Sequence, residues 1–361
     1  MPGPSRAAQR GDHPVPTPKW TLTVADVVAE TADAATIVFD PPDTGDCAYR
    51  PGQFLTLRVP SDQTGAVARC YSLCSSPATD KRLAVTVKRT AEGYASNWLC
   101  DNVRVGDRID CLPPSGVFTP ADLHTDLLLI AGGSGITPML SITKTVLARG
   151  RGHVVLLYAN RDPEAVIFAA ALRDLVNDHP DRLTVIHWLE AVQGLPNDQT
   201  LARLLAPYAG HDVFICGPSL FMRSARSAVE SFGVPRSRIH IENFVSLSGD
   251  PFVDKPVDVD QVPPAAADKP QQTAEVVVQL NGDTHTLTWT RKDTLIDLLI
   301  AQGIEAPYSC REGDCGTCQC MLLDGEVDMD THGALDEEDI AEGVVLGCQA
   351  RPASDHITVE F

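Results

Sequence analysis

The sequence has few aromatic residues, few positive charges and no long uninterrupted apolar run. Its longest apolar stretch, Leu127 to Ile142, is broken by residues 132–135 and Thr137, so no transmembrane helix is expected. Residues 1–19 contain five prolines but no apolar signal-peptide segment, and they predict a disordered tail. Asp and Glu outnumber Lys and Arg by 48 to 29, a net charge of −19. We therefore expect no membrane partner and no nucleic-acid partner.

Eleven cysteines are an odd number in a chain without a secretory signal. This disfavours a secreted disulfide scaffold and favours a cytoplasmic protein that keeps some cysteines as metal ligands. The length of 361 residues and the 43% of apolar residues predict two or three domains with ordinary cores.

Residue patterns divide the chain after the tail into four parts. Residues 20–121 contain short alternating runs separated by turn signals, and predict an antiparallel barrel. Residues 122–247 alternate strands with helical patterns such as EAVIFAAALRDLVND, and predict a parallel sheet covered on both faces. Residues 248–272 are rich in Pro and Asp and predict a linker. Residues 273–361 predict a hairpin across Asn281-Gly282 and a small sheet folded around one helix.

The acidity belongs to the last part, where 18 Asp and Glu oppose four Lys and Arg. A solvated acidic face is one interpretation. The other is a docking face that attracts a basic partner protein over a long range. Its candidate contacts are Glu312, Asp314 and the run Asp336, Glu337, Glu338 and Asp339.

Four cysteines in residues 273–361 have the spacing of metal ligands. Cys310, Cys315 and Cys318 form C-x4-C-x2-C, and Cys348 follows 29 residues after the last of them. This is the spacing of plant-type [2Fe–2S] ferredoxins. Structural zinc is the alternative, but zinc sites usually contain two separate C-x2-C pairs, and here only one is present. We expect the remaining cysteines, Cys320 among them, to be packed thiols.

A glycine-rich turn follows the strand that ends at Ala131. It consists of Gly132, Gly133, Ser134 and Gly135, and Thr137-Pro138 then predicts a helix start with Thr as N-cap and Pro at the first helical position. Such a turn lets a pyrophosphate approach the backbone at a helix N-terminus, although a tight strand–helix turn without a ligand has the same pattern. Cys216-Gly217-Pro218 ends a later strand of the same sheet, where ligands of open α/β sheets bind.

The segment Arg69-Cys70-Tyr71-Ser72 lies on a predicted barrel strand and completes a recognisable set of motifs. With VTVKRTAEGYASNWLCD, LLYANRD and YSCREGDCGTCQC, it resembles the ferredoxin–NADP reductase-type flavoproteins that carry a C-terminal plant-type ferredoxin domain. Within this group the strings are most similar to the reductase components of 3-ketosteroid 9α-hydroxylases. The resemblance implies a multidomain α/β and β fold, with an antiparallel Greek-key flavin barrel, a Rossmann-like parallel-sheet NAD domain and a β-grasp ferredoxin domain.

The resemblance also implies roles for single residues. Tyr71 would stack on the flavin ring, Ser72 would bond near its N5 atom, and Cys216, Glu242 and Phe244 would lie where the nicotinamide meets the flavin. The further residues implied to bind FAD are Arg69, Cys70, Val87, Lys88, Arg89, Gly93, Tyr94, Ala95 and Ser96. Those implied to bind NADH are Gly132, Gly133, Ser134, Gly135, Thr137, Pro138, Asn160, Arg161, Cys216, Gly217 and Pro218.

The function implied is a monomeric NADH-dependent reductase that uses FAD and the [2Fe–2S] cluster to pass single electrons to a Rieske-type terminal oxygenase. That oxygenase would hydroxylate 3-ketosteroids at carbon 9 in steroid or cholesterol catabolism. Three alternatives remain at this point: a reductase for another oxygenase, such as the one acting on phenylacetyl-CoA, a redox sensor without catalytic flux, and a flavin reductase with a vestigial cluster.

Overall fold

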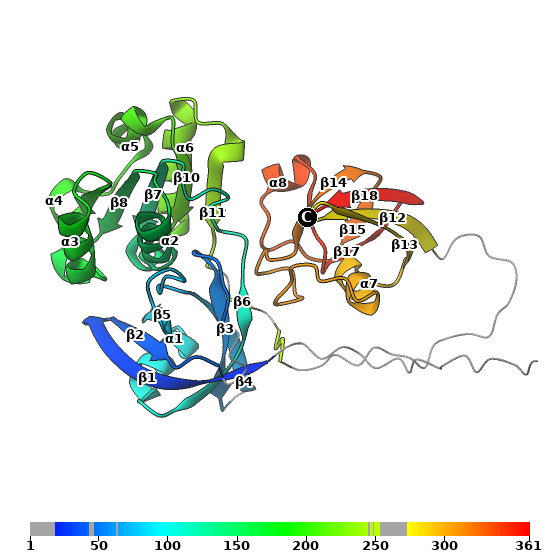
Figure 1. The fold of residues 1–361 in the computed structure, drawn as a ribbon, viewed down its shortest axis with the longest axis horizontal. Helices are drawn as coiled ribbons and strands as arrows, with labels where there is room; N and C mark the ends of the chain where they lie inside the picture. Colours follow the sequence, from blue (N-terminus) through cyan, green and yellow to red (C-terminus); the bar gives the residue numbers. More distant parts are fainter. Residues whose placement is uncertain (1–18, 43–46, 63, 245, 248, 253–272) are drawn as a thin grey trace, which may run out of the picture.

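The computed structural model describes residues 19–42, 47–62, 64–244, 246–247, 249–252 and 273–361. The predicted tail, except Lys19, and the predicted linker, except residues 249–252, lie outside the described residues. Figure 1 shows three domains in chain order: a barrel in blue and cyan, an α/β domain in green and a small β-rich domain in orange and red. No helix in the described ranges is long and apolar enough to cross a membrane.

The first domain is an antiparallel six-stranded sheet with the order β4-β3-β6-β1-β2-β5. A bridge between Leu73, just after β4, and Val85 in β5 joins the two edges and closes the barrel. Apolar side chains such as Leu22, Phe39 and Leu55 fill its interior. The elements are β1 (Trp20–Thr31), β2 (Ala34–Phe39), β3 (Phe54–Ser61), β4 (Gly65–Ser72), β5 (Leu83–Lys88), α1 (Tyr94–Asn102) and β6 (Arg108–Ser115).

The second domain is a parallel five-stranded sheet with the order β11-β10-β7-β8-β9. Alternate residues of its central strand pack on different helices: Leu129 joins the core with α2 and α3, and Leu128 the core with α5 and α6. The strand order reverses between β7 and β10. The elements are β7 (Leu127–Gly132), α2 (Ile136–Arg149), β8 (Val154–Asn160), α3 (Ala169–Asp178), β9 (Leu183–Leu189), α4 (Glu190–Gln193), α5 (Asp198–Leu205), β10 (Asp212–Cys216), α6 (Ser219–Ser231) and β11 (Ile239–Glu242).

Two helix starts differ from the sequence prediction. The helical pattern over residues 164–178 forms a helix only from Ala169, because Phe168 has a left-handed φ of 61° and interrupts it. The helix after the glycine-rich turn begins at Ile136, with Gly135 as its N-cap, so the prediction of Thr137 as N-cap was wrong. A turn of 3₁₀-helix over Gly133–Gly135 takes the place of the extended N-cap residue, and Thr137 Oγ1 instead donates to the carbonyl of Ser134.

The third domain is a five-stranded mixed sheet with the order β13-β12-β18-β14-β16, packed on α7. The predicted hairpin is confirmed, because Asn281 and Gly282 both have positive φ, 54° and 89°, between β12 and β13. The elements are β12 (Thr273–Leu280), β13 (Asp283–Thr290), α7 (Leu295–Ala301), β14 (Gln319–Asp324), β15 (Val327–Met329), α8 (Glu337–Ala341), β16 (Val344–Leu346), β17 (Ala350–Pro352) and β18 (His356–Glu360).

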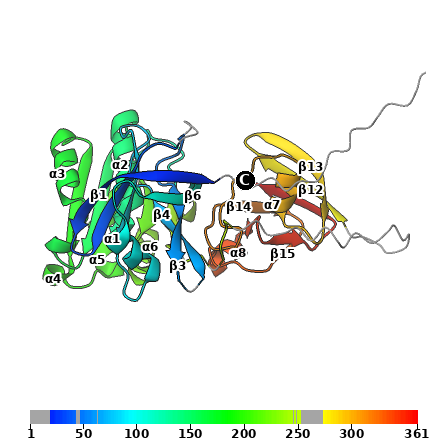
Figure 2. The same ribbon diagram turned by 90° about the horizontal axis from the view of Figure 1, so that it is seen from below.

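The third domain lies beside the other two (Figures 1 and 2), and its helix α8 is on the side that faces α6 and β11. An apolar cluster joins the barrel to this domain: Ala68 and Leu112 pack with Cys310, together with Leu247 and Phe252. Three predicted domain types are thus present in the predicted order, with the third in direct contact with the first two.

Candidate functional site

A cleft of about 430 Å³ opens between the barrel and the second domain. The end of β4, Lys88 at the end of β5, the start of α1 and the turn before α2 line it. Most of the residues implied to bind FAD therefore lie together. Those on its walls are Arg69, Cys70, Tyr71, Ser72, Lys88, Gly93, Tyr94, Ala95, Ser96, Ser134, Thr137 and Phe244.

Positive charge lies in and beside this cleft and is held by neighbouring groups. Arg69 donates to the carbonyl of Ala68 at 2.6 Å and to that of Leu247 at 3.3 Å. Lys88 lies 3.8 Å from the carboxylate of Asp33, which Arg161 also approaches at 3.4 Å. These contacts orient the cations before any ligand arrives, which suits recognition of phosphate groups.

The N-terminus of α1 offers backbone donors to the same cleft. Its N-cap is Gly93, and no side chain caps the helix. A Cβ at Gly93 would lie 2.8 Å from Thr90 Cβ and 3.0 Å from Ser96 Oγ, so only glycine fits there. Uncapped N–H groups at a helix start favour an anion. The residues present therefore fit the pyrophosphate of a flavin dinucleotide.

Two residues implied to bind FAD do not reach the cleft with their side chains. Val87 is fully buried in the barrel core. Arg89 forms an ion pair with Asp101 at 2.7 Å on α1. Their neighbour Lys88 lies on the cleft because successive strand residues point to opposite faces.

The glycine-rich turn lies beside a second cleft at the point where the strand order reverses. Gly132, Gly133, Ser134, Gly217 and Pro218 line this cleft. In an open α/β sheet this reversal creates the crevice in which dinucleotides bind. A Cβ at Gly135 would lie 2.1 Å from the carbonyl oxygen of Cys216, so this glycine permits the two loops to touch.

The two residues implied to bind the adenine side of NADH lie at the end of β8. Asn160 is buried, and Arg161 extends to Asp33. The next residue, Asp162, accepts a hydrogen bond from the backbone of Ala165 at 2.8 Å and caps a short 3₁₀-helix. The carboxylate is therefore fixed at the carboxyl end of the strand.

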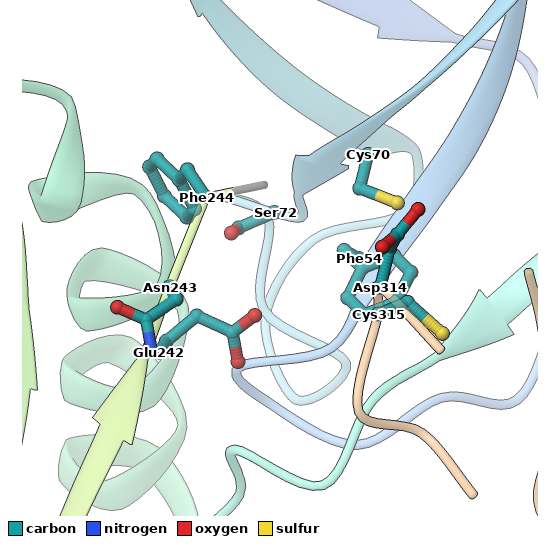
Figure 3. A pocket seen from close by; sticks show the side chains of 8 residues that line it. All are labelled: Phe54, Cys70, Ser72, Glu242, Asn243, Phe244, Asp314 and Cys315. Carbon is teal, nitrogen blue, oxygen red and sulfur yellow. The ribbon is translucent and has the colours of Figure 1, made fainter. Parts of the chain in front are cut away.

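Figure 3 shows a small pocket where all three domains meet. Glu242 and Phe244 enter it from the end of β11, and Ser72 from β4. Cys216 is fully buried beside Glu242 in the paired strand, and burial raises the pKa of its thiol well above the usual value. Desolvation likewise raises the pKa of the Glu242 carboxyl to about 8. A carboxyl that is protonated at neutral pH can donate a hydrogen bond or a proton here.

The four spaced cysteines form two close pairs. Cys310 hydrogen-bonds to Cys315 and Cys318 to Cys348, and these bonds lower the pKa of Cys315 and Cys348. Backbone N–H groups also point at sulfur: that of Cys310 lies 3.5 Å from Cys315 Sγ, and that of Glu312 lies 3.4 Å from Cys310 Sγ.

Two pairs of thiols suit two irons better than one zinc ion. Among the described residues, no set of three or more His, Cys, Asp or Glu side chains is arranged to hold a single metal ion. A [2Fe–2S] cluster takes two ligands on each iron, whereas structural zinc needs four around one centre. The cysteines therefore fit the binuclear cluster. Cys320 is buried in the core of the domain, as expected for a packed thiol.

The loop that carries Cys315 lies directly against the flavin strand. Figure 3 shows Asp314 and Cys315 beside Cys70 and Phe54, and Cys70 packs in one apolar cluster with Cys310 and Cys315. Thr56 Oγ1 of β3 lies 3.4 Å from Ser309 Oγ. Sequence analysis missed Phe54 and Thr56, because no local pattern marks a contact between residues about 250 positions apart.

Family models match each domain. An oxidoreductase FAD-binding domain matches residues 21–119, an oxidoreductase NAD-binding domain residues 129–227, and a 2Fe-2S iron-sulfur cluster binding domain residues 278–353. These matches confirm FAD, a nicotinamide cofactor and the [2Fe–2S] cluster as the cofactors. They also show that the chain is an oxidoreductase, which excludes a sensor without catalytic domains.

Whole-chain comparisons extend these domain matches. The 3-ketosteroid-9-alpha-monooxygenase ferredoxin reductase component of Rhodococcus rhodochrous is 55% identical over 94% of this chain and 96% of its own length. One subunit of the 1,2-phenylacetyl-CoA epoxidase of Escherichia coli is 34% identical, over 94% and 97%. The crystal structure of a phthalate dioxygenase reductase shares the fold, with a TM-score of 0.54 and 24% identity over 95% and 98% of the two chains. The chain belongs to the family of ferredoxin reductase components of 3-ketosteroid-9-alpha-monooxygenases, in which FAD-binding, NAD-binding and [2Fe–2S] domains form one electron-transfer chain.

Proposed function

We propose that this protein is the cytoplasmic, monomeric reductase of a Rieske-type oxygenase that hydroxylates 3-ketosteroids at carbon 9. The single observation that carries the electron-transfer part is the meeting of three domains in one pocket, where the flavin strand separates the nicotinamide crevice from the cysteine loop. When bound, FAD accepts a hydride from NADH, and the cluster passes on one electron at a time. The steroid part is supported by the name of the 55% identical relative.

The chain's own residues have distinct roles in this proposal. Arg69, Lys88 and the start of α1 at Gly93 bind the flavin pyrophosphate, and Tyr71 and Ser72 hold its ring. The turn over Gly132–Gly135 and the loop Cys216–Pro218 bind the nicotinamide dinucleotide.

At the meeting point, Phe244 covers the flavin position until the nicotinamide arrives, since its side chain is about half exposed over both clefts. Protonated Glu242, beside the buried Cys216, supplies a hydrogen-bond donor without adding a negative charge. The four cysteines Cys310, Cys315, Cys318 and Cys348 hold the cluster.

The partner can be tested by reconstitution. The purified reductase is mixed with NADH and a candidate 3-ketosteroid oxygenase, or with a phenylacetyl-CoA epoxidase. Formation of hydroxylated steroid, coupled to NADH consumption, is the expected result. Product with the epoxidase alone would show that the reductase serves the other class of oxygenase represented among its relatives.

A further inference from the structure

Two arginines of the NAD-binding domain form ion pairs with a short acidic segment of the ferredoxin domain. Arg226 on α6 pairs with Asp336 at 2.9 Å and with Glu338. Arg236 pairs with Glu338 at 2.7 Å and Glu342 at 2.9 Å, and also with Asp336 and Asp339. We call these two arginines and four carboxylates the α6–α8 ion-pair cluster.

Several features distinguish this cluster from isolated surface ion pairs. The side chains of Arg226 and Arg236 are only 17% and 27% exposed. Both arginines contact Asp336 and Glu338, so one pair restricts the geometry of the next. Asp336 also forms a capping box with Asp339 at the start of α8, which fixes the carboxylates before docking. Networks of this kind hold charges more effectively than single exposed pairs.

The cluster lies on the same interface as the electron-transfer contact. Residues 333–336, just before α8, line the nicotinamide cleft together with Gly217 and Phe244. The loop with Cys315 meets Cys70 and Ser72 on the flavin strand. The ferredoxin domain therefore touches the rest of the chain at the cysteine loop and at α8, and fixing α8 also restricts the orientation of the loop.

We propose that Arg226 and Arg236 are positioning residues for electron transfer from the flavin to the cluster. They hold α8 so that the loop with Cys315 stays against the flavin strand. Three of the four acids in the run Asp336–Asp339, which the sequence suggested for an external partner, form this contact within the chain. Because the contact is ionic and partly solvated, it weakens as salt rises, and the domain undocks. The proposal rests on the order of electron flow proposed above.

The test uses the full-length holoprotein and an Arg226→Glu/Arg236→Glu variant, without any oxygenase. Stopped-flow absorption follows flavin reduction and cluster reduction after mixing with saturating NADH. We expect cluster reduction to slow at least tenfold in the variant, while flavin reduction changes less than twofold. Wild-type cluster reduction should slow as ionic strength rises, and the Arg226→Lys/Arg236→Lys variant should stay near wild type, because it keeps the charges.

A structural readout tests docking independently of turnover. Small-angle scattering should show a larger radius of gyration for the charge-reversed variant at low salt, and for the wild type at high salt. Arg203→Glu, at an exposed position on α5, makes the same charge change away from α8 and should leave both readouts unchanged. The reduced-cluster EPR signal checks that each variant keeps its cluster.

The outcomes separate this inference from the proposed function. Equal rates of cluster reduction in the wild type and the charge-reversed variant, with equal scattering, would refute the role of the two arginines. No cluster reduction by NADH in the wild type would instead refute the order of electron flow.

Discussion

The buried carboxyl of Glu242 makes the stability of this protein depend on pH, and Glu242→Gln should remove that dependence. Desolvation raises the pKa of this group from 4.5 to about 8. The folded protein therefore binds a proton more tightly than the unfolded chain does. Stability is full below pH 4.5 and is lost as the pH rises toward 8, because ionisation then opposes folding. Glutamine has the shape of the protonated acid and does not titrate in this range.

The difference in pKa between the unfolded and the folded chain sets the size of the effect. A difference of about 3.5 pH units at 1.36 kcal/mol each is roughly 5 kcal/mol. Because the side chain is not fully covered in the pocket, water reduces this, and we expect roughly 2–5 kcal/mol. At about 2–4 °C per kcal/mol, the melting temperature of the variant should gain roughly 5–15 °C on the wild type between pH 5 and pH 9.

The assay is thermal unfolding of the FAD-loaded protein at several pH values, followed by circular dichroism and by flavin fluorescence. The matched control is Glu190→Gln, at an exposed position on α4. Its melting temperature should run parallel to that of the wild type at every pH. A gap between Glu242→Gln and the wild type that stays constant from pH 5 to pH 9 would refute the burial argument, because it would mean that the carboxyl titrates alike in both states.

Further outcomes follow from the other site residues. Cys348→Ser should abolish the reduced-cluster EPR signal and cytochrome c reduction, while NADH oxidation by ferricyanide continues; retention of the EPR signal would contradict the ligand assignment. Gly135→Ala brings a Cβ to 2.1 Å from the carbonyl oxygen of Cys216 and should weaken NAD⁺ binding at least tenfold by titration, whereas Gly210→Ala, with no atom within 4 Å, should bind normally. The fixed carboxylate of Asp162 should repel a 2′-phosphate, so steady-state kinetics should give at least tenfold lower kcat/KM with NADPH; equal values would exclude this role.

Several features followed from sequence because their signals are local. The spacing of Cys310, Cys315 and Cys318 requires one short loop to carry three thiolates. The turn at Asn281-Gly282 requires positive φ at both residues, which these residue types tolerate. Strand–helix alternation in residues 122–247 led to a parallel sheet, since each crossover helix must cover a face of the sheet. In each case the determining residues are neighbours in the chain.

Local signals were insufficient where a competing contact decided the outcome. Thr137 and Pro138 form a good helix start by propensity, but the 3₁₀ turn over Gly133–Gly135 moved that start to Ile136. The pattern over residues 164–178 is helical throughout, but the left-handed conformation of buried Phe168 shortened the helix. Tertiary packing overrides weak helix propensities of this kind.

The tertiary structure alone decided how the domains meet. The acidic run at Asp336 has the same composition whether it faces water, a partner protein or Arg226 and Arg236, and only folding brings these groups together across about 100 residues. The raised pKa of Glu242 likewise depends on side chains from three domains that cover its carboxyl. Sequence thus determined the cofactors and the fold of each domain, because short motifs encode them. Burial and long-range charge pairing exist only in the assembled chain, and they determined the electron-transfer contact.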